Sequence, residues 1–230
     1  MAETIPIAAD FLEAGSSGTA VVLVHSSVSG ARQWRRLMDD LAGRFRVRAI
    51  NLFGYGKTPP WPGHRTQTLD DQAALVEAAA PEGPICLVGH SFGGSVAMKA
   101  AARLGPRATK LVLLEINPFY LLDQAGRTTA FAEAWALRDT IKKHGGLGEW
   151  EEAAAVFADY WGGAGTWGNT PAERRAAFAE ALKPNFFEWD AVMGETTPAA
   201  SAAAPGTGGG CGGCPGRDRS APCRCLRGPA

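Results

Sequence analysis

The chain has 230 residues, a length that suits one α/β domain with a substantial core. Lys plus Arg number 23 and Asp plus Glu also number 23, so the formal net charge is zero and nothing favours nucleic acid as a partner. No stretch approaches the roughly 20 apolar residues of a membrane span, and residues 1–15 contain acidic side chains that a secretory signal would lack. We therefore expect a cytoplasmic protein with no membrane or nucleic-acid partner.

Strands and helices are predicted to alternate through the first half of the chain. The predicted strands are short apolar runs bounded by Gly, Pro, Ser or Asn, at residues 20–25, 47–53, 84–89 and 110–116. The predicted helices between them cover residues 33–41, 66–80 and 92–104, and Thr68 is the expected cap of the second. Because the strands are apolar throughout, we expect a mostly parallel sheet with helices on both faces, which is a three-layer α/β architecture.

The second half of the chain changes character twice. Residues 121–195 are predicted to be helical and are rich in aromatic side chains, which either pack between helices or form an apolar cap over a substrate pocket. Residues 196–230 consist mostly of Gly, Ala, Pro, Arg and Cys without any periodicity, and we predict that they are disordered. The chain is thus divided into a core over residues 1–120, a cap-like segment over 121–195 and a low-complexity tail over 196–230.

One motif carries chemistry: Gly-His-Ser-Phe-Gly-Gly at residues 89–94, directly after a predicted strand and directly before a predicted helix. In this context Gly-X-Ser-X-Gly is typical of a nucleophilic serine on a tight, strained turn, with glycines where a Cβ would clash. Ser91 is therefore the candidate nucleophile. The backbone N–H of Phe92, at the start of the helix, is placed to bind a developing oxyanion.

Four segments make the sequence resemble the α/β-hydrolase fold superfamily over about residues 18–195: VVLVHSSVSGARQW, RVRAINLFGYGKTPP, ICLVGHSFGGSVAMKAA and LVLLEINPFYLL. The similarity is greatest to the branch of esterases, C–C hydrolases, cofactor-free haloperoxidases and epoxide hydrolases. It implies a serine hydrolase for a small apolar ester or related acyl or C–C substrate, with no cofactor and no metal. It also implies that the backbone N–H of Ser27 is the second oxyanion donor. Ser26 stands where relatives usually have glycine, and Asn51 and Thr58 also depart from the family pattern.

The resemblance further implies an acid and then a histidine after the nucleophile, with the histidine near the C-terminus. The chain has four histidines, His25, His64, His90 and His144, and none of them lies near the C-terminus. His144 is a weak candidate for a displaced catalytic base. Without a histidine to activate it, the serine hydroxyl is a poor nucleophile.

The candidate acid is Glu115, at the end of the predicted strand 110–116. A minority of relatives, notably haloalkane dehalogenases, carry their carboxylate after the corresponding strand. A glutamate at an apolar strand end is costly unless it is paired, so Glu115 is either the orienting acid or a carboxylate satisfied by loop N–H groups or a hydroxyl. Asp190 is a weaker candidate, because it falls within the aromatic helical segment.

The tail replaces two further strand–helix units that the resemblance implies after about residue 198. We favour a shifted reading frame in a GC-rich coding sequence over the alternative, a zinc site built from the tail cysteines, Cys211, Cys214, Cys223 and Cys225. The alternative function is accordingly a truncated or catalytically impaired hydrolase-like protein that keeps its pocket. Neither the oligomeric state nor the particular substrate is predicted.

Overall fold

The computed structural model describes residues 8–198 of the chain. The predictions for residues 199–230, namely disorder, a frameshift or a zinc site, lie outside the described residues. The sheet has five strands in the order β1-β3-β2-β4-β5. The strands are β1 (Phe11–Ala14), β2 (Ala20–Val24), β3 (Arg46–Ile50), β4 (Ile85–His90) and β5 (Ala108–Leu114). All neighbours are parallel except β1 and β3, so the mostly parallel α/β sheet is confirmed.

Strand β1 was missed by the sequence prediction. It pairs antiparallel with the edge of β3, and Glu13 lies directly opposite Arg48. The Arg48 side chain donates to the Glu13 carboxylate at 2.5 Å. With only four residues and one charged side chain among them, β1 offers no apolar run that would mark it as a strand.

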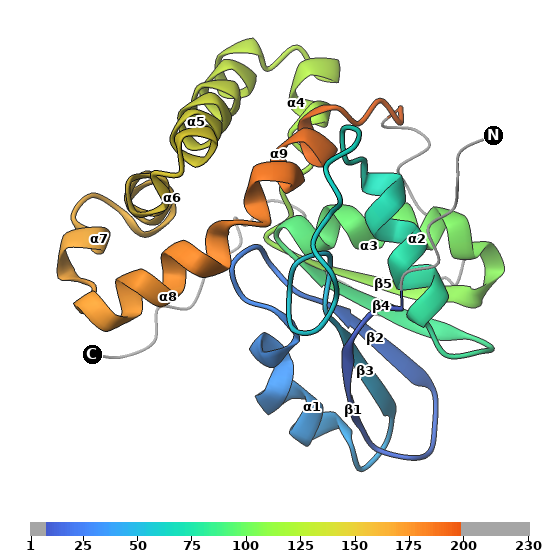
Figure 1. Ribbon diagram of the computed structural model, residues 1–230. Helices are drawn as coiled ribbons and strands as arrows, with labels where there is room; N and C mark the ends of the chain where they lie inside the picture. The colour runs from blue at the N-terminus through green and yellow to red at the C-terminus, as the bar shows by residue number, and fades with distance from the viewer. Residues whose placement is uncertain (1–7, 199–230) are drawn as a thin grey trace, which may run out of the picture.

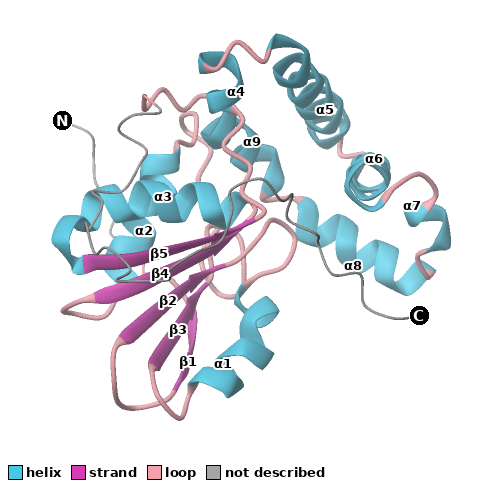
Figure 2. Ribbon diagram, turned by 180° about the vertical axis from the view of Figure 1, so that it is seen from behind, coloured by secondary structure: helices cyan, strands magenta, loops and turns pink. Residues whose placement is uncertain are grey.

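Helices cover the sheet from both sides, as Figure 2 shows. A 3₁₀ turn (Ala31–Trp34) and α1 (Arg35–Leu41) pack on one face, against Val21, Leu23, Val47 and Val88 among others. On the opposite face lie α2 (Leu69–Ala79) and α3 (Phe92–Leu104), and a short 3₁₀ turn (Gly105–Arg107) follows α3. The predicted cap of α2 is confirmed, because Thr68 and Asp71 form a reciprocal capping box.

Both faces were predicted to be covered, and this is wrong at β5. Val112 and Leu114 are 42% and 41% exposed, and Lys110 on the same face is also exposed. β5 is an edge strand, and no later strand follows it among residues 8–198. The apolar sequence of β5 predicts burial, but no described helix packs on this face of the strand.

The remaining helices lie together on one side of the sheet, as the yellow and orange ribbons of Figure 1 show. They are α4 (Tyr120–Gln124), α5 (Thr128–Leu147), α6 (Trp150–Gly162), α7 (Thr166–Asn169), α8 (Ala172–Leu182) and α9 (Asn185–Met193). Within the described part of the chain, no helix has both the length and the apolar character needed to cross a membrane.

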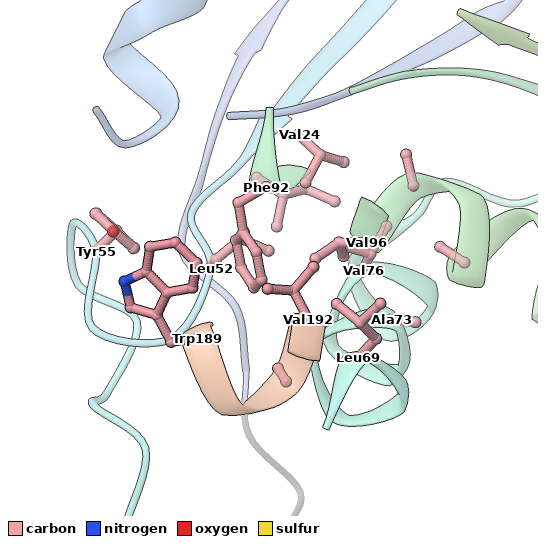
Figure 3. Close-up of a cluster of buried hydrophobic side chains, with 14 of the residues drawn as sticks. Val24, Leu52, Tyr55, Leu69, Ala73, Val76, Phe92, Val96, Trp189 and Val192 are labelled. Carbon is pink, nitrogen blue, oxygen red and sulfur yellow. The ribbon is translucent and has the colours of Figure 1, made fainter. Parts of the chain in front are cut away.

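Helix α9 joins this helical group to the main core. Figure 3 shows Trp189 and Val192 of α9 beside Phe92, the first residue of α3, with Val24 and Leu52 from the sheet side. All five side chains are buried. The residue that follows the candidate nucleophile is therefore fixed in the core, which limits how far the turn before it can move.

Candidate functional site

Ser91 lies on a sharp turn between β4 and α3. Its backbone has φ 51° and ψ −123°, a left-handed conformation that is strained for a residue with a side chain. A Cβ at Gly93 would overlap the carbonyl oxygens of His25 and Val24, and one at Gly89 would overlap backbone atoms of Gly93. The motif's two flanking glycines are thus required by close backbone approach, as the sequence predicts.

Two backbone segments converge on Ser91 from the carboxyl ends of neighbouring parallel strands. Ser27 follows β2, and it lines the same cavities as Ser91. Phe92 is the first residue of α3, so its N–H has no acceptor within the helix. The structure brings Ser27, Ser91 and Phe92 together around one small cavity.

The larger cavity in front of Ser91 has a volume of about 560 Å³. Its walls are mostly apolar and include Phe119, Leu121, Phe157 and Trp161 from the α4–α6 region. A cavity of this size and character is typical of a binding site for a small apolar ligand, and Ser91 lies in its wall. A second cavity of about 20 Å³ adjoins Ser91 and has room for roughly one water molecule.

A buried carboxylate at the site, Glu188 of α9, was missed by the sequence prediction. Its side chain is 1% exposed and accepts three hydrogen bonds: from Ser27 Oγ (2.5 Å), Tyr55 OH (2.9 Å) and Asn185 Nδ2 (3.0 Å). Burial raises the pKa of Glu188, and the three hydrogen bonds oppose that rise. The signal in the sequence was a charged residue among the large apolar residues of α9.

Glu115 lies just after β5 and lines the larger cavity together with Ser91. Its side chain is 90% exposed, so the carboxylate remains solvated and does not pay the free-energy cost of burial that the sequence predicts. Its Oε2 lies 3.6 Å from Nε2 of His90, and it makes no hydrogen bond to a loop N–H within residues 8–198. The other ring nitrogen of His90, Nδ1, lies 3.1 Å from Nε2 of Gln33.

His25 has a structural position. Its Nδ1–H donates to the carbonyl oxygen of Ser26 at 2.7 Å, and its Nε2 accepts the N–H of Leu52 at 3.1 Å. Burial lowers the pKa of His25 to about 4, so the ring is neutral and ties the loop after β2 to the end of β3.

Neither of the two remaining histidines lines a cavity next to Ser91. His64 is exposed and stacks on Trp61, while His144 pairs with Glu149 at the end of α5. Across residues 8–198, no histidine is hydrogen-bonded to the hydroxyl of Ser91.

Asp190 takes part in ion pairs outside the site. It binds Arg138 and Lys142 and so fastens α9 to α5, and it lines neither cavity next to Ser91. Among residues 8–198, no group of three or more His, Cys, Asp or Glu side chains could hold a metal ion.

The chain resembles curated proteins over part of its length. It is 35% identical over 106 residues to a pimeloyl-[acyl-carrier protein] methyl ester esterase of Pectobacterium carotovorum, a match that covers 46% of this chain and 40% of the relative. It is 37% identical over 108 residues to the lipase LipV of Mycobacterium tuberculosis, covering 44% and 39%. The chain thus spans about 40% of the length of these relatives.

Solved structures share the fold at lower sequence identity. MenH from S. aureus superposes with a TM-score of 0.57 at 17% identity, covering 81% of this chain and 70% of that chain. An alpha/beta hydrolase from Sphaerobacter thermophilus superposes with a TM-score of 0.54 at 22% identity, covering 87% and 77%. The family model described as the alpha/beta hydrolase fold matches residues 19–176. The chain therefore belongs to the α/β-hydrolase fold family.

Proposed function

We propose that the protein is a cytoplasmic serine hydrolase that acts on a small, largely apolar ester or a related acyl or C–C substrate. The observation that carries the proposal is the conformation of Ser91, held at positive φ between two crowded glycines and facing an apolar cavity of about 560 Å³. Relatives named as esterase and lipase favour an ester as the substrate.

In this mechanism the hydroxyl of Ser91 attacks the substrate carbonyl carbon. The backbone N–H groups of Phe92 and Ser27 stabilise the negative charge that develops on the carbonyl oxygen. Collapse of the intermediate breaks the ester C–O bond and leaves an acyl-serine, while the proton given up by the Ser91 hydroxyl goes to the leaving alkoxide, which departs as the alcohol. Water then hydrolyses the acyl-serine, which releases the carboxylic acid and restores the Ser91 hydroxyl. Glu115, the one carboxylate lining the larger cavity within the described residues, is the proposed acid. Residues 121–195 form the cap that supplies the apolar wall, over a core of residues 1–120.

A second candidate function is a hydrolase-like protein that binds such a ligand without turning it over. It is favoured by one observation: no histidine among residues 8–198 is hydrogen-bonded to the hydroxyl of Ser91. In this case the cavity remains a binding site, while the serine lacks a general base.

Hydrolysis of p-nitrophenyl acetate by the wild type and by Ser91→Ala tests the proposal. Ser16→Ala, which removes an exposed hydroxyl in the turn between β1 and β2, is the matched control. We expect turnover in the wild type and the control, and a loss on the order of a thousandfold or more in Ser91→Ala. Equal rates in all three proteins would reject catalysis by Ser91. A single burst of p-nitrophenol without turnover would mean that Ser91 is acylated but that no base supports deacylation.

A further inference from the structure

The loop that follows β2, residues 26–29, holds a costly backbone conformation beside Ser91. Val28 has φ 68°, a region that β-branched residues rarely occupy. Such a conformation persists only where surrounding contacts over-determine it. The contacts of residues 26–29 therefore show what keeps the loop, and the N–H of Ser27 within it, in place.

Two consecutive residues of this loop are tied to the same carboxylate. Ser27 reaches Glu188 directly, since its Oγ donates to Oε2 at 2.5 Å. Val28 reaches it through Tyr55: the N–H of Val28 donates to the Tyr55 oxygen, and the Tyr55 hydroxyl donates to Glu188 Oε1, both at 2.9 Å. The three elements joined in this way are the loops after β2 and β3 and the helix α9.

The chemistry of this arrangement calls for a carboxylate at position 188. Because the oxygen of Tyr55 already accepts from Val28, its own hydrogen must point to an acceptor. A glutamine would turn its NH₂ either toward Tyr55, whose hydrogen then loses its acceptor, or toward Ser27 and Asn185, which would both have to reorient from donating to accepting. Both Tyr55 and Glu188 are buried, so a lost partner leaves a polar group that only a water molecule in the small cavity beside Glu188 could satisfy.

We infer that Glu188 and Tyr55 are positioning residues that hold the loop of residues 26–29 in the conformation that presents the N–H of Ser27 to the oxyanion. The role of Ser27 as an oxyanion donor rests on the proposed function. The hydrogen bonds that connect Glu188 through Tyr55 to Val28 do not depend on it. Glu188 acts at a distance, because it contacts neither the N–H of Val28 nor the hydroxyl of Ser91 through any hydrogen bond among the described residues.

Amide hydrogen exchange of a peptide spanning residues 25–31 tests the link without any need for activity. The variants are Tyr55→Phe and Glu188→Gln. The matched controls are Tyr160→Phe and Glu133→Gln, which make the same two changes in another tyrosine–glutamate hydrogen bond, this one exposed on the surface of the helical group. Exchange of a peptide from α2 reports any general loss of stability in each protein.

We expect exchange in residues 25–31 to accelerate roughly tenfold in both test variants relative to the α2 peptide, as for a lost hydrogen bond to a charged group. Both controls are expected to match the wild type. Unchanged exchange in Glu188→Gln would overturn the inference. Exchange that accelerates equally in residues 25–31 and in the α2 peptide would also overturn it, because Glu188 would then contribute only to the stability of the whole protein.

A second measurement links the loop to the proposed chemistry. The rate at which a fluorophosphonate labels Ser91 is expected to fall roughly tenfold in Tyr55→Phe and Glu188→Gln, because the labelling transition state also uses the oxyanion donors. Labelling that stays at the wild-type rate while exchange accelerates would overturn the positioning role. If the wild type itself is not labelled, the proposed function fails, and the exchange experiment still decides whether Glu188 holds the loop.

Discussion

The two sides of Ser91 are built very differently. On one side, the loop of residues 26–29 is fastened by Tyr55 and Glu188, both buried, and every oxygen of the Glu188 carboxylate has a donor. On the other side, Glu115 is 90% exposed and lies 3.6 Å from His90, next to β5, whose outer face is not covered by any element among residues 8–198. The loop proposed to stabilise the oxyanion is thus held by buried hydrogen bonds, whereas the carboxylate proposed as the acid is exposed to solvent.

The difference indicates that the proposed nucleophile and its proposed oxyanion donors are positioned by local backbone geometry. Ser91, Phe92 and Ser27 are set by the ends of β4 and β2 and by the start of α3. An acid–histidine pair draws on distant parts of a chain. Within residues 8–198 no strand lies beyond β5, and the carboxylate–histidine contact described on that side is the exposed one between Glu115 and His90.

The largest effect is expected on the side of the loop of residues 26–29, from Gly93→Ala. Its new Cβ would overlap the carbonyl oxygens of His25 and Val24, neither of which can move without shifting β2. We expect the free energy of unfolding to fall by more than about 3 kcal/mol, measured by urea denaturation. Gly146→Ala in α5 is the control, because a Cβ there meets nothing within 4 Å, and it should add about 0.5–1 kcal/mol. A stable, soluble Gly93→Ala protein would contradict the described turn.

The next effect is a pH dependence of stability that comes from His25. Its pKa is about 4 in the folded protein and 6.5 in the unfolded chain, so its contribution is complete above pH 6.5. As the pH falls, the unfolded chain binds a proton that the folded ring does not bind, because the ring is buried and its Nε2 already accepts the N–H of Leu52. About 3 kcal/mol of stability is therefore lost between pH 6.5 and pH 4.

Urea denaturation at pH 7 and pH 5 checks this. The difference between the two pH values should shrink in His25→Asn and stay unchanged in His64→Gln, which alters an exposed ring. Glu188 works in the opposite direction, since its pKa is raised in the folded state. Each variant is therefore compared with the wild type, so that this contribution cancels. An equal pH dependence in His25→Asn and the wild type would disprove the assignment.

A smaller effect is expected on the solvent-exposed side, from Glu115→Gln. If Glu115 is the acid, turnover should fall roughly tenfold, equivalent to about 1.4 kcal/mol in the barrier. Stability should change by less than about 0.5 kcal/mol, because the side chain is exposed. His90→Gln should lower turnover by a similar factor, and the double variant by no more than either alone. Additive losses would show that Glu115 and His90 act separately.

The smallest effect on stability is expected from Val112→Lys on the open face of β5. Val112 is 42% exposed, so the free energy of unfolding should change by less than about 0.5 kcal/mol. A charge on an edge strand also opposes edge-to-edge association, so light scattering at high protein concentration should decrease. Val88→Lys is the control: Val88 lies opposite Val112 on β4 but is buried, and its replacement should be strongly destabilising. Equal destabilisation by both would mean that the outer face of β5 is covered in solution.

Sequence reasoning recovered those elements whose residues signal their own structure. The boundaries of α3 were predicted residue for residue, because Ser91 precedes it and Gly105 ends it. The capping box at Thr68 was likewise local. Strand β1 was missed, since four residues with one charge show no period.

Long-range contacts were beyond the reach of the sequence. Glu188 meets Ser27 across 161 positions of the chain and Tyr55 across 133, and no local pattern encodes such pairings. The exposure of Glu115 was not predicted either, because the local sequence pattern was misleading. Its apolar neighbours in β5 indicate burial, but no described element covers that strand face.

The most direct test of the central claim is the intact mass of the protein after reaction with a fluorophosphonate, followed by peptide mapping. The account predicts one adduct per chain, located on Ser91, and no adduct in Ser91→Ala. An unmodified wild-type protein would contradict the claim that Ser91 is a nucleophile, as would an adduct that persists in Ser91→Ala.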